Sequence, residues 1–196
     1  MIGADELLKK QMELLLNGQV NLALLDVEKA YVEKHALLHE GAIQHKTSLH
    51  FNVIERCDKL NEELLAEETE TFLAMPVQYL QEHAHEFMYV ESDRFEVIRV
   101  DSFALEYDEA FAVYSALFGL RLQKKQGEFL HTYLTTHLQH ENITYSMAFS
   151  GQDGLWEVNL ALNALEGFSE QQSFGEVFVL LYRFVFELLV ELEETL

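Results

Sequence analysis

The strongest constraint on the fold is a pair of runs in the second half of the chain in which apolar and polar residues alternate. The runs are "ITYSMAFS" (143–150) and "LWEVNLALN" (155–163). A period of two is the pattern of a β-strand with one buried face. The link "GQDG" between them is short and contains glycine and aspartate, which favour tight turns. The sequence therefore predicts an antiparallel hairpin over about 143–163.

The C-terminal run "FGEVFVLLYRFVFELLVELEETL" (174–196) is apolar on most sides of a helix. A membrane span needs about 20 mostly uncharged residues, whereas Arg183 and Glu187 interrupt this run. We therefore expect a long helix that packs on the hairpin. Because the run has more apolar residues than one packed face needs, part of it is also a candidate contact for a second chain. The candidate partner-binding residues share a helical spacing: Phe174, Phe178, Tyr182, Phe186 and Leu189.

The rest of the chain reads as mainly helical. Spacings of three and four between apolar residues predict helices, and "RFEVIRV" (94–100) predicts a strand. The predicted helices cover 4–16, 19–38, 48–74, 76–88, 108–120 and 127–139. We expect an α+β fold: a small antiparallel or mixed sheet that includes 143–163, covered by helices, with a helical N-terminal region and a long C-terminal helix. One domain over 1–196 is expected, with a soft boundary near 75.

Charge argues against several classes of partner. The chain has 34 acidic and 13 basic residues, which gives a net charge of −21. Such a field repels phosphate, so we expect neither nucleic-acid binding nor binding to acidic membranes. The acids concentrate in two zones, with 12 acids against 4 bases in 51–100 and 9 against 1 in 151–196. These zones would attract a basic protein surface.

The compartment and the redox state follow from the N-terminus and the cysteine content. "MIGADELLKKQMELLL" lacks the cationic start and the cleavage site of a signal peptide. We therefore expect a cytoplasmic protein. Cys57 is the single cysteine, so the chain has no internal disulfide and no cysteine-based zinc site.

Two Glu-x-x-His matches are the candidates for a metal site. Glu82 precedes His85 and Glu128 precedes His131 by three residues, a spacing that places carboxylate and imidazole on one face of a helix. With this glutamate and histidine content about one such match is expected by chance. The two pairs are therefore weak candidates for metal ligands, and surface histidines are the simpler interpretation.

Known catalytic and cofactor motifs do not occur in the sequence. There is no phosphate-binding glycine loop, dinucleotide fingerprint or nucleophile elbow. Carboxylates are so numerous that the sequence singles out no acid–base pair. We expect no cofactor, and whether the chain is an enzyme stays open, with the balance against it.

The stretches "FMYVESDRFEVIRVDSF", "FGLRLQKKQ" and "DGLWEVNLALN" resemble those of small proteins from Gram-positive spore-forming bacteria. This resemblance implies no active-site residue or ligand. A hairpin followed by a long acidic helix is also similar in arrangement to acidic secretion-chaperone-like domains, which bind other proteins.

Two functional hypotheses remain. The first is an acidic protein-interaction module, which forms a homodimer or binds a basic partner as a chaperone or adaptor does. The alternative is a small enzyme or metal-binding protein that uses the histidines and glutamates of 82–86 and 128–131.

Overall fold

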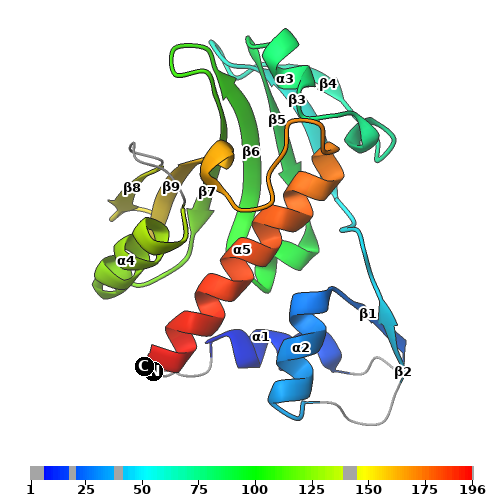
Figure 1. Cartoon of the computed structure of the whole chain (residues 1–196), viewed down its shortest axis with the longest axis vertical. Coiled ribbons are helices and arrows are strands. Elements are labelled where there is room, and N and C mark those ends of the chain that lie inside the picture. Colours follow the sequence, from blue (N-terminus) through cyan, green and yellow to red (C-terminus); the bar gives the residue numbers. More distant parts are fainter. Residues whose placement is uncertain (1–6, 18–20, 38–41, 139–144, 196) are drawn as a thin grey trace.

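The chain has an α+β fold, as the sequence predicts (Figure 1). The computed structural model describes residues 7–17, 21–37, 42–138 and 145–195. The strands are β1 (Asn21–Leu24), β2 (Ala42–His45), β3 (Val53–Asp58), β4 (Leu64–Glu67), β5 (Glu86–Glu91), β6 (Val100–Asp108), β7 (Val113–Leu120), β8 (Tyr145–Ser150) and β9 (Leu155–Ala161). The α-helices are α1 (Leu7–Leu16), α2 (Asp26–Lys34), α3 (Tyr79–Glu82), α4 (Gly127–His137) and α5 (Phe174–Thr195). Short 3₁₀ turns occur at Phe72–Ala74, Asp93–Glu96, Lys124–Gln126 and Leu162–Ala164.

Seven strands form one antiparallel sheet in the order β4-β3-β5-β6-β7-β9-β8. β1 and β2 form a separate parallel pair. The turns that begin at Asp58 and Asp108 share one chemistry, because each carboxylate accepts hydrogen bonds from the backbone N–H groups two and three residues further on. Local turn chemistry thus positions the β3–β4 and β6–β7 connections.

The hairpin predicted over 143–163 is confirmed by the pairing of β8 with β9; its first two residues lie outside the described part of the chain. The helix beside it is α4. Trp156 of β9 lies so close to Gly127 that a Cβ atom there would be 2.5 Å from the indole ring. Tyr145 of β8 also bonds to α4, through a contact of 2.6 Å between its hydroxyl and Nδ1 of His131.

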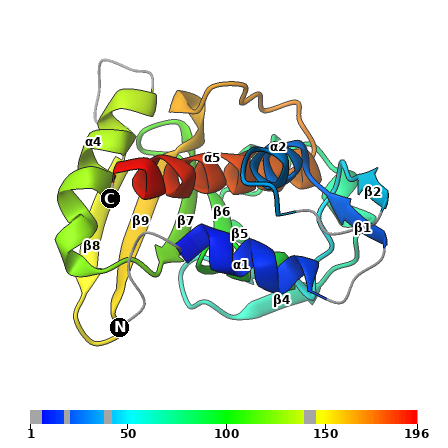
Figure 2. The same cartoon turned by 90° about the horizontal axis from the view of Figure 1, so that it is seen from below.

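The C-terminal helix α5 is confirmed and lies across one face of the sheet (Figures 1 and 2). It starts with a capping box: Ser173 Oγ accepts the Glu176 N–H at 3.3 Å, and the Glu176 carboxylate accepts the Ser173 N–H at 2.8 Å. Its buried side chains join those of the sheet in a single apolar core. Ile54, Val90, Phe103, Phe118 and Leu160 point into this core from five strands.

A buried carboxylate joins the N-terminal region to α5. Glu28 of α2 is fully buried and forms an ion pair with Arg94, with Nε–Oε1 and Nη2–Oε2 distances of 2.7 and 2.5 Å. The Tyr182 hydroxyl of α5 donates to the same carboxylate at 2.6 Å, and the Leu25 N–H donates at 2.8 Å. Burial first, and then the charge of Glu28, raise the pKa of Tyr182 well above its ordinary value. The phenol therefore stays a hydrogen-bond donor.

Glu193 makes a second connection near the end of α5. Its Oε1 accepts the N–H groups of Leu8 and Lys9 at 2.6 and 3.1 Å, so it caps the start of α1 from a distant part of the chain. Its Oε2 accepts the Tyr31 hydroxyl of α2 at 2.6 Å. The first two helices are thus attached to α5 by two carboxylates.

Two predicted helices are wrong because their sequences form strands. The segment 48–74 contains β3 and β4, and 108–120 contains a turn followed by β7. In β3 the side chains of Ile54 and Cys57 are buried and their spacing of three imitates a helical period. Ile54 pairs with Val90 and Cys57 with Phe87 in an unbroken register, so the two buried side chains lie on opposite faces of a regular strand that has a neighbour on each side.

Three further boundaries are corrected. The segment 19–38 contains β1 before α2, and 76–88 contains only the short α3 before β5 starts. The predicted strand 94–100 is mostly a 3₁₀ turn, and the strand β6 begins only at Val100. Arg99 has a φ of +60°, which ends any extended run there. The other two predicted helices, within 4–16 and 127–139, are confirmed as α1 and α4 over the residues that the structure describes.

Within the described ranges, none of the helices combines the length and the apolar character needed to cross a membrane.

Candidate functional site

The first metal candidate, Glu82 with His85, does not form the predicted helical pair. Glu82 ends α3, and His85 lies in the link that precedes β5. Both side chains are exposed, and the nearest carboxylate to the His85 Nε2 atom belongs to Glu86, at 3.6 Å. The helical geometry that motivated this pair is therefore absent here.

The second candidate, Glu128 with His131, does lie on one helix, α4, with both side chains exposed. His131 uses its Nδ1 atom in the bond to Tyr145. α3 and α4 lie in different parts of the fold (Figure 1). Nowhere in the described ranges do three or more His, Cys, Asp or Glu side chains gather as a metal would require. The structure therefore does not bring the four candidates together.

The partner-binding candidates on α5 are a correction. All five side chains are at most 1% exposed, namely Phe174, Phe178, Tyr182, Phe186 and Leu189. Phe178 packs against Phe51 with ring centroids 5.4 Å apart, and Phe186 packs edge-on against Tyr31 at 5.8 Å. The N-terminal segments cover a part of α5 that the sheet leaves free, and the side with Arg183 and Glu187 faces solvent. In this structure these five side chains are therefore not accessible to a partner.

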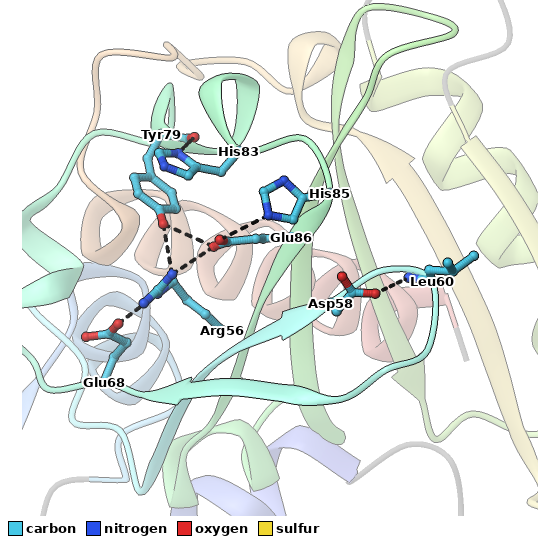
Figure 3. A network of polar contacts seen from close by, with 8 residues as sticks. All are labelled: Arg56, Asp58, Leu60, Glu68, Tyr79, His83, His85 and Glu86. Atoms are coloured by element: carbon cyan, nitrogen blue, oxygen red, sulfur yellow. Dashed lines mark hydrogen bonds and ion pairs between the residues drawn. The ribbon is translucent and has the colours of Figure 1, made fainter.

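A polar network at the edge of the core surrounds Arg56 (Figure 3). Its guanidinium donates to Glu68 at 2.7 Å and to Glu86 at 3.0 Å, and the Tyr79 hydroxyl donates to Glu86 at 3.0 Å. The Phe72 and Tyr79 rings lie 5.4 and 5.9 Å from the guanidinium carbon. Burial opposes the charge, but the bonds to both carboxylates hold the pKa of Arg56 above its ordinary value.

The polar side chains of this network form hydrogen bonds with one another. Burial first, and then the bond to Glu86, raise the pKa of Tyr79, so the phenol remains protonated. His83 stacks on the Tyr79 ring at 3.9 Å and bonds to the Tyr79 carbonyl through Nδ1. These bonds join β3, β5 and the segment after β4.

Two adjoining cavities lie along the solvent side of α5. The larger, about 480 Å³, has Tyr133, His137, Arg183 and Glu187 among its lining residues. Burial raises the pKa of Glu187, against the opposing effect of Arg183. The smaller, about 150 Å³, is lined by Arg183 and Lys46 among others. Mixed charges line both cavities, and in the smaller one His45 Nδ1 lies 3.0 Å from Asp26 Oδ1.

Sequence reasoning missed the face of the sheet that points away from α5. Figure 2 shows α2, α4 and α5 together on one side of the sheet, with α1 across its end. On the other side, partners in register form a row across the strands: Glu67, Glu55, Tyr89, Ala104, Leu117, Asn159 and Ser146. Tyr89, Ala104 and Leu117 at the centre of this row are partly exposed. We call this surface the uncovered face.

The uncovered face is acidic. Its carboxylates include those of Glu55, Glu67, Glu91, Glu106 and Glu157. The seven strands of the sheet contain a single lysine or arginine, Arg56. Arg56 pairs with Met88, a core residue, and so points to the helix side. Cations lie at its margins, where Lys59 Nζ is 3.5 Å from Glu106 and Arg121 pairs with Asp101.

Two neighbouring acids on this face have no cation between them. Glu55 and Glu67 are directly opposite in the pairing of β3 with β4, and like charges in that position repel. Tyr89 is the other direct neighbour of Glu55, and its hydroxyl donates to Glu91 at 2.7 Å. Burial first, and then the bond to Glu91 and the charges of Glu91 and Glu55, raise the pKa of Tyr89 against the opposing bond with Ser102. An aromatic ring between carboxylates is thus held neutral.

The signal for this face was present in the sequence but was divided among strands that read as helices. Glu55 and Glu67 both fell within the predicted helix 48–74. Comparisons of the chain with protein-family models, curated proteins and solved structures give no match. The resemblance to proteins of spore-forming bacteria therefore stays a prediction.

Proposed function

We propose that this chain is a protein-interaction module that binds a basic protein partner through the uncovered face. The observation that carries the proposal is a broad sheet surface with five carboxylates and no strand cation. Acidic surfaces speed the encounter with basic partners through long-range attraction.

Attraction alone does not give a stable complex, because exposed ion pairs contribute little at cellular salt. The centre of the uncovered face supplies the apolar contact. Phe87, Tyr89, Ala104 and Leu117 are all partly exposed on neighbouring strands. Apolar and aromatic residues inside a charged rim are the usual composition of a protein interface.

The same surface argues against a second copy as the partner. Two uncovered faces in contact would bring ten carboxylates together with little compensating positive charge. Like charges brought together at an interface cost affinity. A basic partner neutralises these groups, whereas a homodimer through this face desolvates them unpaired.

The test is a binding titration with a basic amphipathic peptide of alternating lysine and leucine. The variant Glu55→Gln/Glu67→Gln/Glu157→Gln removes three charges from the uncovered face. The matched control, Glu33→Gln/Glu128→Gln/Glu166→Gln, removes three exposed charges from the helix side. We expect about a tenfold loss of affinity at low salt for the first variant. The control keeps most of the affinity, because its charges lie away from the contact.

Equal losses in the two variants would show that only net charge matters, and the proposal would be wrong. As a second measurement, light scattering determines the oligomeric state of the unmodified protein and of the variant. A dimer that becomes tighter in the Glu55→Gln/Glu67→Gln/Glu157→Gln variant would identify the uncovered face as a self-association surface instead.

A further inference from the structure

The strand β4 has the properties of an open docking edge. It is the first strand in the order of the sheet, and no described strand pairs with its outer side. Leu60, Leu64 and Leu65 at this edge are 95%, 51% and 46% exposed. Sheet proteins protect an edge by a short strand, a bulge, charged side chains or proline, or by a covering segment, and β4 is short and flanked by glutamates. The glutamates oppose pairing with another acidic strand, whereas the three exposed leucines leave apolar surface that a strand of opposite charge would cover.

The main chain of β4 has groups free to pair outward. The Glu68 N–H donates to the Ile54 carbonyl of β3 at 2.8 Å. In an antiparallel ladder the direction of the N–H and C=O groups reverses at each residue. The N–H and C=O of the preceding residue, Glu67, which lies opposite Glu55, therefore point away from β3. They are available to a further strand.

The β4 strand of a second copy does not fit this edge. Antiparallel pairing of β4 with itself about Leu65 would place Glu63 opposite Glu67 and Glu62 opposite Glu68. Shifting the register by one residue still places acid opposite acid. Like charges at directly opposed positions destabilise a sheet. The charge pattern thus selects a strand with basic side chains.

We propose that a basic, extended segment of the partner adds to β4 as an eighth strand of the sheet. This inference rests on the proposed function and specifies how the partner is held. Alternate side chains of an added strand point to the uncovered face, where Glu67 and Glu55 lie in one row. Lysine or arginine at those positions meets the two carboxylates. Main-chain bonds to Glu67 fix the register, and Leu64 and Leu65 provide apolar contact.

The decisive experiment compares two peptides of alternating lysine and valine that differ only in their main chain. One is unmodified, and the other is N-methylated at alternate residues, so that it keeps its charge but loses the donors on one edge. We expect the methylated peptide to bind about tenfold more weakly, because each lost main-chain bond costs affinity. Equal binding of the two peptides would overturn strand addition.

A protein-side pair of variants gives an independent measurement. Glu67→Gln removes the charge and keeps the N–H, whereas Glu67→Pro removes both. Because the N–H of Glu67 faces outward, proline there leaves the ladder with β3 intact. We expect Glu67→Pro to weaken binding of the unmodified peptide clearly beyond Glu67→Gln. Equal affinities of the two variants would contradict the inference.

Amide exchange in the unmodified protein does not depend on the folding of a variant. Peptide binding should slow exchange at the outward N–H of Glu67, and unchanged exchange there would overturn strand addition. The experiments distinguish the failure of the two proposals. The Glu55→Gln/Glu67→Gln/Glu157→Gln variant can lose affinity while the unmodified and the N-methylated peptides bind equally. In that case the uncovered face binds the partner without an added strand. If neither peptide binds at low salt, both proposals are wrong.

Discussion

Charged side chains have different surroundings on the two faces of the sheet. On the helix side, Glu28 is fully buried but has partners in Arg94, Tyr182 and a backbone N–H. On the uncovered face, Glu55 and Glu67 are opposed with no cation between them. A buried charge must be paired for the fold to survive, whereas a partly exposed one is stabilised by water. The opposed carboxylates of Glu55 and Glu67 therefore do not contribute to the stability of the fold, which favours a role in binding.

The largest expected difference between the faces is in apolar packing. Phe178→Ala on the helix side should lower the free energy of unfolding by about 4 kcal/mol, because it opens a cavity in the core. Leu117→Ala on the uncovered face should cost about 1 kcal/mol, because Leu117 is partly exposed. Urea unfolding of both variants measures the difference. Similar costs would mean that the uncovered face is part of the core.

The next difference concerns buried charge. Glu28→Gln should cost about 3 kcal/mol, because it leaves the Arg94 guanidinium, whose side chain is 12% exposed, without its counter-charge. Replacing Arg94 and Glu28 together by apolar residues should recover part of that loss. Chemical denaturation of the single and double variants provides the comparison. If the double variant loses more free energy of unfolding than the two single variants together, the pairing of Glu28 with Arg94 is wrong.

The start of α5 gives a smaller effect with a pH signature. Ser173→Ala should cost about 1 kcal/mol through loss of the cap. Hydrogen bonds from the Ser173 side chain and backbone lower the pKa of Glu176. That contribution to stability is therefore present above the ordinary glutamate pKa and is lost as pH falls through the lower folded value. Unfolding curves at neutral and acidic pH should show a smaller cost of Ser173→Ala in acid, and a constant cost would contradict the assignment.

The smallest expected effect has the opposite sign. Glu55→Gln should raise stability by about 0.5 kcal/mol, because it removes the repulsion with the directly opposed Glu67. The gain should shrink in high salt, which screens the repulsion. Thermal unfolding at low and high salt measures both. Destabilisation by Glu55→Gln would mean that this carboxylate has a stabilising partner and that the two faces do not differ as described.

The sequence predicts the fold where pairing is local. The hairpin of β8 and β9 needs only a short turn between two alternating runs, and α5 needs only its own cap and apolar run. β3 could not be predicted in this way, because it lies between β4 and β5, and burial of Ile54 and Cys57 on its two opposite faces imitates a helical spacing. A strand fixed by distant partners has a weak signature in its own sequence.

The candidate site was predictable in its charge but not in its position. The acidic zone of 51–100 supplies Glu55, Glu67 and Glu91 to the uncovered face. The apolar residues of α5 indicated a contact surface, but the sequence contains no sign that Phe51 and Tyr31 would cover Phe178 and Phe186. Which of two apolar surfaces stays free depends on long-range packing, and a single sequence does not encode that locally.

The most direct test of the central claim is a titration of methyl-labelled protein with the alternating lysine–leucine peptide at low salt, followed by NMR. The account predicts that the methyl signals of Ala104 and Leu117, on the uncovered face, shift with peptide concentration. The signals of Leu181 and Val185, buried on α5, should stay in place. Shifts confined to the α5 methyl groups, or to the cavities beside them, would contradict the account.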